Sequence, residues 1–139
     1  MGRKVKIGII QQHSVLGNVK KNIEKAVEMI DDLGKQGADI ICLPELFATG
    51  YNLESLGGVK TLELIREHNK YIEESMSEAA KRNNVYLISP YGTLEKGSTH
   101  VYNSAVIFDR KGKIMGEYCK NHLWSLEAVY FKGGEKVEV

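Results

Sequence analysis

Two ionisable residues that each follow a predicted β-strand are the strongest candidates for chemistry. Glu45 comes directly after the apolar run 40–43, among apolar neighbours, and Lys120 stands at the end of the strand predicted for 113–118. Partial burial would raise the pKa of a glutamate toward that of a useful general base, and a fixed lysine beside it can stabilise a developing oxyanion. Taken singly, Glu45 also fits a solvated loop acid, and Lys120 fits an edge-strand lysine that discourages aggregation.

The other reactive side chains give no metal or cofactor motif. The four histidines are scattered, and Cys119 with His122 is the only pair at metal-like spacing, which is too few ligands for zinc. The glycine pairs at 57–58 and 133–134 lack the strand, glycine loop and helix that cradle a phosphate. We therefore expect neither a metal site nor a cofactor.

The elements that must position Glu45 and Lys120 alternate between strand and helix. Residues 4–11 carry apolar side chains at period two, which predicts a strand whose Val5, Ile7 and Ile9 face a core. A helix should follow, from an N-cap at Asn18 to glycines 34 and 37, with an apolar stripe made of Val19, Ile23, Ala26, Val27, Ile30 and Leu33. The run 40–43 does not alternate, as expected for a central parallel strand covered on both faces.

The second half of the chain predicts another helix, a strand and a hairpin. The helix should run from Thr61 to Asn83-Asn84, on the stripe Leu62, Ile65, Ile72, Met76 and Ala79. A strand is expected at 85–89, and segments 101–108 and 113–118 flank a polar turn that ends in glycine, so a hairpin should extend one edge of the sheet. Residues 121–139 should be irregular with one short helix. The fold class is therefore α/β, a mixed sheet with flanking helices and right-handed crossovers, with the ligand site outside the carboxyl ends of the strands.

Composition limits the partners and the compartment. The 139 residues are 42% hydrophobic and 27% charged, which suits one soluble globular domain. A net charge of +1 argues against nucleic acid and acidic membrane surfaces as partners. No stretch is long enough to span a bilayer or to act as a signal peptide, and the two cysteines form no disulfide framework, so we expect the cytoplasm.

Several blocks, taken in order, resemble those of the nitrilase superfamily of carbon-nitrogen hydrolases. Residues 43–51, Leu-Pro-Glu-Leu-Phe-Ala-Thr-Gly-Tyr, are similar to the block around that family's catalytic glutamate, and residues 118–123 are similar to its catalytic-lysine block. Flanking pieces also match, in the family's order: 7–11 before 16–18, then 102–105, then 127–131 before Gly133. Because the resemblance covers essentially the whole chain, it favours the functional interpretation of Glu45 and Lys120.

The resemblance implies a fold, a reaction and a site. The fold would be the first half of a four-layer α-β-β-α sandwich, with residues 1–139 as a single truncated domain. The reaction would be hydrolysis of a non-peptide amide, nitrile or carbamoyl amine, with Glu45 as general base, Lys120 stabilising the tetrahedral intermediate and Glu127 positioning the substrate or Lys120. Tyr51 and Trp124 are candidates to line the substrate pocket, although surface or core packing explains them equally well.

The nucleophilic cysteine of the family is expected on a strand well after the lysine block, and this sequence ends at Val139 first. Cys42 lies in the apolar run, where burial predicts an inert thiol, and Cys119 should point to the strand face opposite Lys120. We therefore expect the chain to be inactive alone. An uncovered apolar sheet face, at about 25 cal/mol per Å², also predicts a homo-oligomer or pairing with a separate C-terminal half.

Two other hypotheses stay open. The chain is also consistent with a non-catalytic truncated paralogue that acts as an interaction or regulatory module. A nucleotide-binding α/β domain fits the alternation of strands and helices, but no phosphate motif supports it.

Overall fold

Strands and helices alternate over the first two thirds of the chain, and an antiparallel hairpin follows them. The computed structural model describes residue 2 and residues 4–135. Its strands are β1 (Ile7–Ile9), β2 (Ile40–Cys42), β3 (Tyr86–Leu94), β4 (Val101–Phe108) and β5 (Ile114–Cys119). Its helices are α1 (Val19–Lys35), α2 (Leu53–Leu56), α3 (Gly58–Asn83) and α4 (Glu127–Tyr130).

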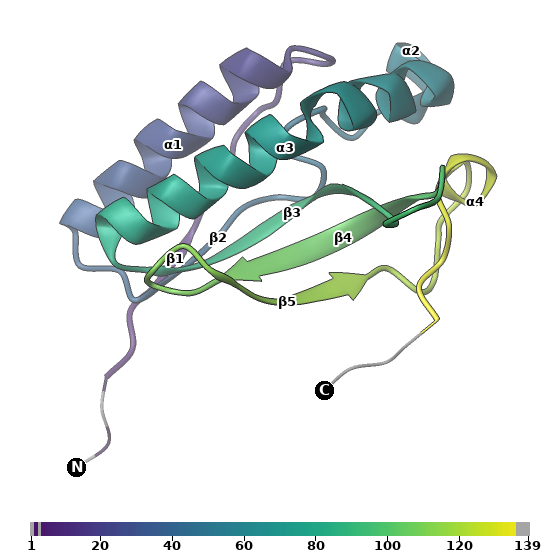
Figure 1. Ribbon diagram of the computed structural model, residues 1–139. Helices are drawn as coiled ribbons and strands as arrows, with labels where there is room; N and C mark the ends of the chain where they lie inside the picture. The colour runs from purple at the N-terminus through teal and green to yellow at the C-terminus, as the bar shows by residue number, and fades with distance from the viewer. Residues whose placement is uncertain (1, 3, 136–139) are drawn as a thin grey trace.

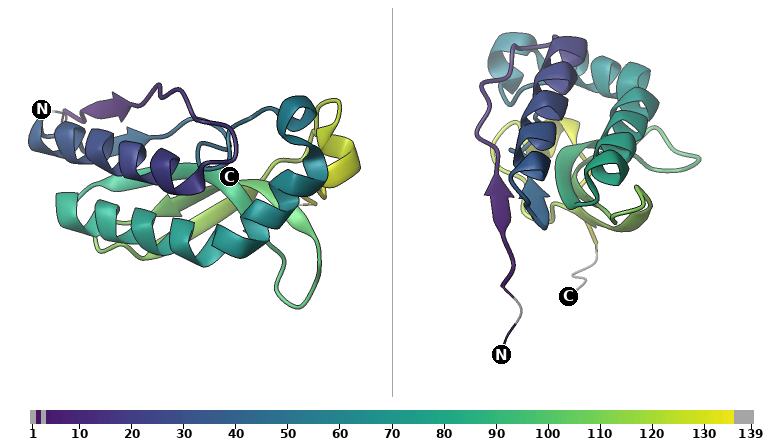
Figure 2. Two further views of the ribbon diagram at one scale, coloured as in Figure 1. Left: turned by 90° about the horizontal axis from the view of Figure 1, so that it is seen from above. Right: turned by 90° about the vertical axis from the view of Figure 1, so that its left-hand side faces the viewer.

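The strands form one sheet in the order β1-β2-β3-β4-β5. β1, β2 and β3 are parallel, whereas β4 and β5 are antiparallel to their neighbours. Figure 1 shows α1 and α3 on the same face of this sheet, and Figure 2 shows them side by side from above. The predicted α/β class, with a mixed sheet, flanking helices and a hairpin at one edge, is therefore confirmed.

The two long helices begin and end for local reasons. The Asn18 side chain accepts a hydrogen bond from the Lys21 N–H at 3.2 Å, so the predicted N-cap of α1 is confirmed. Of the two glycines predicted to stop α1, Gly37 does so, at φ 78° just after the C-cap Gln36. Gly34 does not, because the helix continues to Lys35, and an added Cβ at Gly34 would press on Asn83 of α3. α3 begins at Gly58 and ends where Asn84 adopts a left-handed conformation, at φ 54°.

The hydrophobic core lies between the helices and one face of the sheet. α1, α3 and the strands each contribute fully buried side chains, among them Ile23, Ile30, Ile41, Ile72, Met76, Leu87 and Phe108. Within residues 4–135, no helix has both the length and the apolar character needed to cross a membrane.

β1 contradicts the prediction in both its length and its buried face. It spans Ile7–Ile9 rather than 4–11, and Val5, Ile7 and Ile9 are exposed, the last two at 61% and 73%. The residues that face the core are Gly8 and Ile10. An added Cβ at Gly8 would lie 2.8 Å from a methyl carbon of Leu33, so the Leu33 side chain of α1 packs against the buried side of β1 while the isoleucines face outward.

The sheet face turned away from α1 and α3 is apolar and open. Register places Ile9, Cys42, Ile88 and Ile107 in one row across four strands. This open face comprises Ile7, Ile9, Ile40, Cys42, Tyr86, Ile88, Ile107 and Tyr118, all of them exposed or half-buried. The prediction that the run 40–43 is covered on both faces is therefore wrong, because the helices cover only one (Figure 1).

Candidate active site

Glu45, Lys120 and Glu127 are brought together at one end of the sheet. Glu45 follows β2, Lys120 follows β5, and Glu127 is the first residue of α4. The Lys120 Nζ atom lies 2.9 Å from Oε1 of Glu45 and 2.8 Å from Oε2 of Glu127. The expectation that an acid and an amine distant in sequence would converge at the strand ends is met.

Two strained backbone positions lie beside the two carboxylates. Leu46, directly after Glu45, has φ 47°, and Ser125, two residues before Glu127, has φ 51°. Left-handed conformations of residues other than glycine cost about 1 kcal/mol or more and cluster at functional sites. Leu46 is held in place because its side chain is fully buried beside Leu53 and Ile65, so packing fixes the turn that presents Glu45.

Asn103 of β4 completes the contact between the three charged residues. Its Nδ2 atom donates to Oε1 of Glu45 and to Oε1 of Glu127, both at 2.7 Å. Its backbone oxygen accepts from the Lys120 N–H at 2.8 Å. Asn103 was not among the predicted site residues, although it lies in the block 102–105 that carries the resemblance. A polar side chain at a buried position of a strand needs hydrogen-bond partners, and this need could have pointed to Asn103.

Glu127 is a buried carboxylate that is held ionised. Its side chain is 0% exposed, and its Oε2 atom also accepts from the Trp124 N–H at 2.8 Å. Burial alone raises the pKa of Glu127, but the hydrogen bonds from Lys120, the Trp124 backbone and Asn103 outweigh it and hold that pKa below its ordinary value. Both oxygens of Glu127 are occupied by donors, so it is poorly placed to accept a further proton.

Lys120 is held as an ammonium between the two acids. Partial burial lowers the pKa of Lys120, but its hydrogen bonds to Glu127 and Glu45 outweigh that effect and raise the pKa above the ordinary value. Glu45 differs from Glu127, because its side chain is 44% exposed and both donors bind its Oε1 atom. Neither donor occupies Oε2 of Glu45, which is therefore the better placed atom for proton transfer.

Tyr51 lines two cavities beside the charged group, and Trp124 lines the smaller of them. A cavity of about 620 Å³ is lined by Glu45, Tyr51 and the loop 12–16, and a smaller one of about 230 Å³ by Tyr51, Trp124 and Glu127. The Tyr51 ring lies 5.9 Å from Lys120 Nζ, within range of a cation–π contact, whereas the Trp124 ring is largely exposed. Tyr51 therefore borders both cavities and the charged group.

The two cysteines lie in other surroundings. Cys42 is part of the open face, where burial raises the pKa of its thiol. Cys119 Sγ accepts a hydrogen bond from the Ser104 hydroxyl at 3.4 Å and donates one to Oε1 of Glu117 at 3.8 Å. No group of three or more metal-ligating side chains occurs in the part of the chain that the structure describes.

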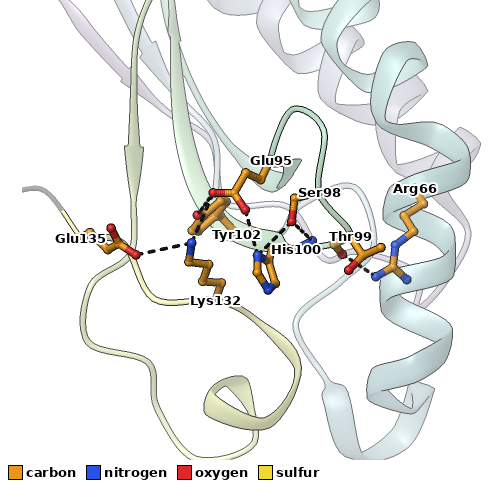
Figure 3. A network of polar contacts seen from close by, with 8 residues as sticks. All are labelled: Arg66, Glu95, Ser98, Thr99, His100, Tyr102, Lys132 and Glu135. Atoms are coloured by element: carbon orange, nitrogen blue, oxygen red, sulfur yellow. Dashed lines mark hydrogen bonds and ion pairs between the residues drawn. The ribbon is translucent and has the colours of Figure 1, made fainter.

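A second polar network anchors the segment that carries Glu127. Figure 3 shows Glu95, at the end of β3, in contact with His100, Tyr102 and Lys132. Hydrogen bonds from His100 and Tyr102, followed by those from Ser98 and Lys132, lower the pKa of Glu95 to about 2. The Lys132 backbone N–H also donates to the Val101 oxygen at 2.9 Å, so the chain after α4 is fixed to β4.

Comparison with known proteins identifies a family and several relatives. Residues 6–139 match the family model described as carbon-nitrogen hydrolase. The chain is 36% identical to a nitrilase of Pyrococcus abyssi and 33% identical to a 2-oxoglutaramate amidase of Bacillus subtilis. Each alignment covers 94% of this chain and 48% of the relative, so the chain spans about half the length of these proteins.

Solved structures give the same result for the fold. A carbon-nitrogen hydrolase from Helicobacter pylori superposes with a TM-score of 0.83 at 26% identity, over 94% of this chain and 45% of that one. An amidase from Nesterenkonia superposes with a TM-score of 0.81 at 20% identity, over 95% and 49% of the two chains. The sheet and helices described above therefore correspond to about half of these larger folds.

Proposed function

The chain belongs to the carbon-nitrogen hydrolase family, and we propose that it supplies the acid and lysine half of an enzyme that hydrolyses a small non-peptide amide, nitrile or carbamoyl amine. One observation carries this proposal: the Lys120 ammonium lies between the Glu45 and Glu127 carboxylates beside two cavities. Relatives described as a nitrilase and an amidase support the substrate class.

The three charged residues would have different roles in this reaction. Oε2 of Glu45 takes the proton of a cysteine thiol, whose sulfur attacks the substrate carbon. The Lys120 ammonium donates to the oxyanion that develops from an amide or carbamoyl amine, or to the nitrogen that becomes negative when a nitrile is attacked, and its raised pKa keeps it charged for that task. With an amide or carbamoyl amine, Glu45 returns the proton to the departing nitrogen and a thioester is left. With a nitrile, that proton goes to the nitrogen of a thioimidate, and a first water, deprotonated by Glu45, adds to the carbon before ammonia leaves and the thioester forms. Water, deprotonated by Glu45, then attacks the thioester, and Glu45 returns that proton to the departing cysteine sulfur as the acid is released. Glu127 holds Lys120 in place, and Tyr51 and Trp124 border the space for the substrate.

The nucleophile in this mechanism comes from outside these 139 residues, because neither Cys42 nor Cys119 is placed at the charged group. We propose that residues 1–139 form one structural unit, half of a catalytic domain, and that a cysteine-bearing half covers the open face. Without that half, self-association of the open face would bury the same apolar side chains. Cys42 and Cys119 are not joined in a disulfide, which suits the reducing cytoplasm, where we place the reaction.

A second candidate function is an interaction or regulatory module without catalysis. The surroundings of Cys119 favour it, because the thiol nearest to Lys120 in sequence is bonded to Ser104 and lies beside an acid. In that case the open face would serve for binding alone, and the charged group would stabilise the end of the sheet.

An assay of three samples separates the two functions. The purified chain, a cysteine-bearing C-terminal half of a relative such as the Pyrococcus abyssi nitrilase, and their equimolar mixture are tested against simple amides, nitriles and carbamoyl compounds. We expect ammonia release only from the mixture, loss of it with Glu45→Gln, and no change with the surface control Glu24→Gln. Binding of the half without hydrolysis would instead support the module. Activity of the chain alone would contradict the roles assigned to its cysteines.

A further inference from the structure

Asn103 touches every charged residue of the candidate site from a single position in β4. It is 3% exposed, and its side chain bridges two carboxylates that lie 58 and 24 residues away in sequence. Its backbone oxygen accepts a hydrogen bond from the Lys120 N–H, so Asn103 also fixes the backbone from which the lysine side chain extends.

The charges of the site explain why a neutral double donor is needed. Two carboxylates and one ammonium leave an excess negative charge in a partly buried place, and the acids repel each other. An amide nitrogen carries two N–H bonds in one plane, so it can donate to both carboxylates at once without adding charge. Because Nδ2 binds Oε1 of each acid, it holds the two carboxylates in fixed relative positions.

The same bonds decide which oxygen can receive a proton. Oε1 of Glu45 accepts from both Lys120 and Asn103, which disfavours protonation of that atom. A proton taken up by Glu45 would therefore be directed to Oε2. Glu127, whose two oxygens accept three hydrogen bonds, is kept ionised and out of the proton transfer.

We infer that Asn103 is a positioning residue for the proposed reaction: it fixes the Glu45 and Glu127 carboxylates around Lys120 and leaves Oε2 of Glu45 as the proton acceptor. This inference rests on the proposed function for its catalytic consequence, but the positioning itself is a property of this chain. The two parts can therefore be tested separately.

The first measurement uses the unaltered protein. Side-chain amide signals of Asn103 are followed by NMR as the pH is lowered through the titration of the glutamates. We expect both Nδ2 protons to shift with those carboxyl groups. The matched control is Asn69 of α3, whose Nδ2 donates to the backbone oxygen of Gly92 at 3.0 Å and should not follow them. Asn103 signals that stay constant, or that behave like those of Asn69, would overturn the inference.

The second measurement uses Asn103→Leu, which keeps the branched shape and the number of side-chain heavy atoms and removes both donors, with Asn69→Leu as control. In Asn103→Leu we expect the pKa of Glu127 to rise, because one of the hydrogen bonds that hold it low is lost while those from Lys120 and the Trp124 backbone remain. In the mixture with a cysteine-bearing half, kcat should fall about tenfold with KM unchanged. A folded variant with the Glu127 titration and kcat unaltered would refute the positioning role. If the unaltered mixture is inactive, the proposed function fails, but the titrations still test the positioning role of Asn103. If Asn103→Leu does not fold, the NMR measurement on the unaltered protein tests that role by itself.

Discussion

The buried carboxylate of Glu127 is the residue on which the electrostatics of the site depend. Removing an ionised group from water costs several kcal/mol unless donors replace the solvent. Here a lysine, a backbone N–H and an amide do so, and the resulting pKa of Glu127 lies below its ordinary value. Lys120 is the only cation among these three donors, so its removal should leave the buried Glu127 carboxylate without a compensating charge.

We predict that Lys120→Met destabilises the fold by about 2 kcal/mol at pH 7 in urea unfolding. A carboxyl whose pKa is lowered on folding stabilises the fold above its unfolded value, near 4.5, and that contribution is lost as the pH falls through the folded pKa. The difference between the variant and the unaltered chain should therefore shrink below about pH 4.

The control for this variant is Lys60→Met, which removes an exposed i,i+3 contact with Glu63. Such surface pairs contribute about 0.5 kcal/mol or less. Equal losses of stability in the two lysine variants would show that Lys120 does not stabilise a buried charge.

The sequence predicted the charged residues better than the groups that hold them. Glu45 and Lys120 became candidates because each follows a predicted strand, and the carboxyl ends of parallel strands are where ligand sites gather. Position alone favoured their non-catalytic interpretations, and the family resemblance reversed that preference. Asn103 was missed because its two acceptors lie on other elements, at sequence separations that no local periodicity reveals.

At the scale of elements, the short helix α4 must be held in place for Glu127 to reach Lys120. Its Tyr130 ring packs directly on Gly58, the first residue of α3, where an added Cβ would overlap the ring. Phe131, next along the chain, is buried with Leu46, the residue after Glu45. The position of Glu127 therefore depends on contacts outside the charged group.

We predict that Gly58→Ala destabilises the fold by about 1–3 kcal/mol, because the Tyr130 ring must move and take α4 with it. Helix propensity alone predicts the opposite sign, a gain of up to about 1 kcal/mol. Urea unfolding measures the difference, and Gly116→Ala in β5, where an added Cβ meets nothing within 4 Å, is the control. A stabilised Gly58→Ala protein would mean that α4 is not packed on α3 as described.

Element prediction failed where a close contact overrode a pattern. The alternation in residues 4–11 gave the strand but the wrong buried face, since period two does not say which face meets the core. The buried face of β1 carries Gly8, against which the Leu33 side chain of α1 packs. The hairpin of β4 and β5 was predicted almost to the residue because its turn is local, with Gly112 at φ 77°.

At the scale of the whole molecule, the open face is the feature that needs explanation. Five strands carry apolar side chains on a face that α1 and α3 do not cover. Patches of this kind mark interaction surfaces in stable proteins. The resemblance to a larger family predicted an uncovered sheet face. Composition alone did not predict it, because the average hydrophobicity of a chain carries no information on where its apolar residues lie.

We predict that Ile9→Lys abolishes self-association of the chain and its pairing with a cysteine-bearing half, while thermal unfolding changes little. Ile9 is 73% exposed at the β1 end of an open-face row, so a charge there costs little in the monomer but must be desolvated in a complex. Sedimentation velocity measures the association, and Val59→Lys on the outer side of α3 is the control. If the unaltered chain is monomeric at all concentrations and does not bind the cysteine-bearing half, the role assigned to the open face is contradicted.

The candidate site and its proposed chemistry depend on one spatial relation: Lys120 lies between Glu45 and Glu127. The most direct test is the NMR signal of the Lys120 ζ-ammonium group, which two charge-assisted hydrogen bonds should protect from exchange with water. We expect a resolved signal for Lys120 at neutral pH that shifts in both Glu45→Gln and Glu127→Gln and stays constant in Glu24→Gln. A Lys120 signal that is averaged with those of the surface lysines, or that does not respond to Glu45→Gln, would contradict the site and the mechanism built on it.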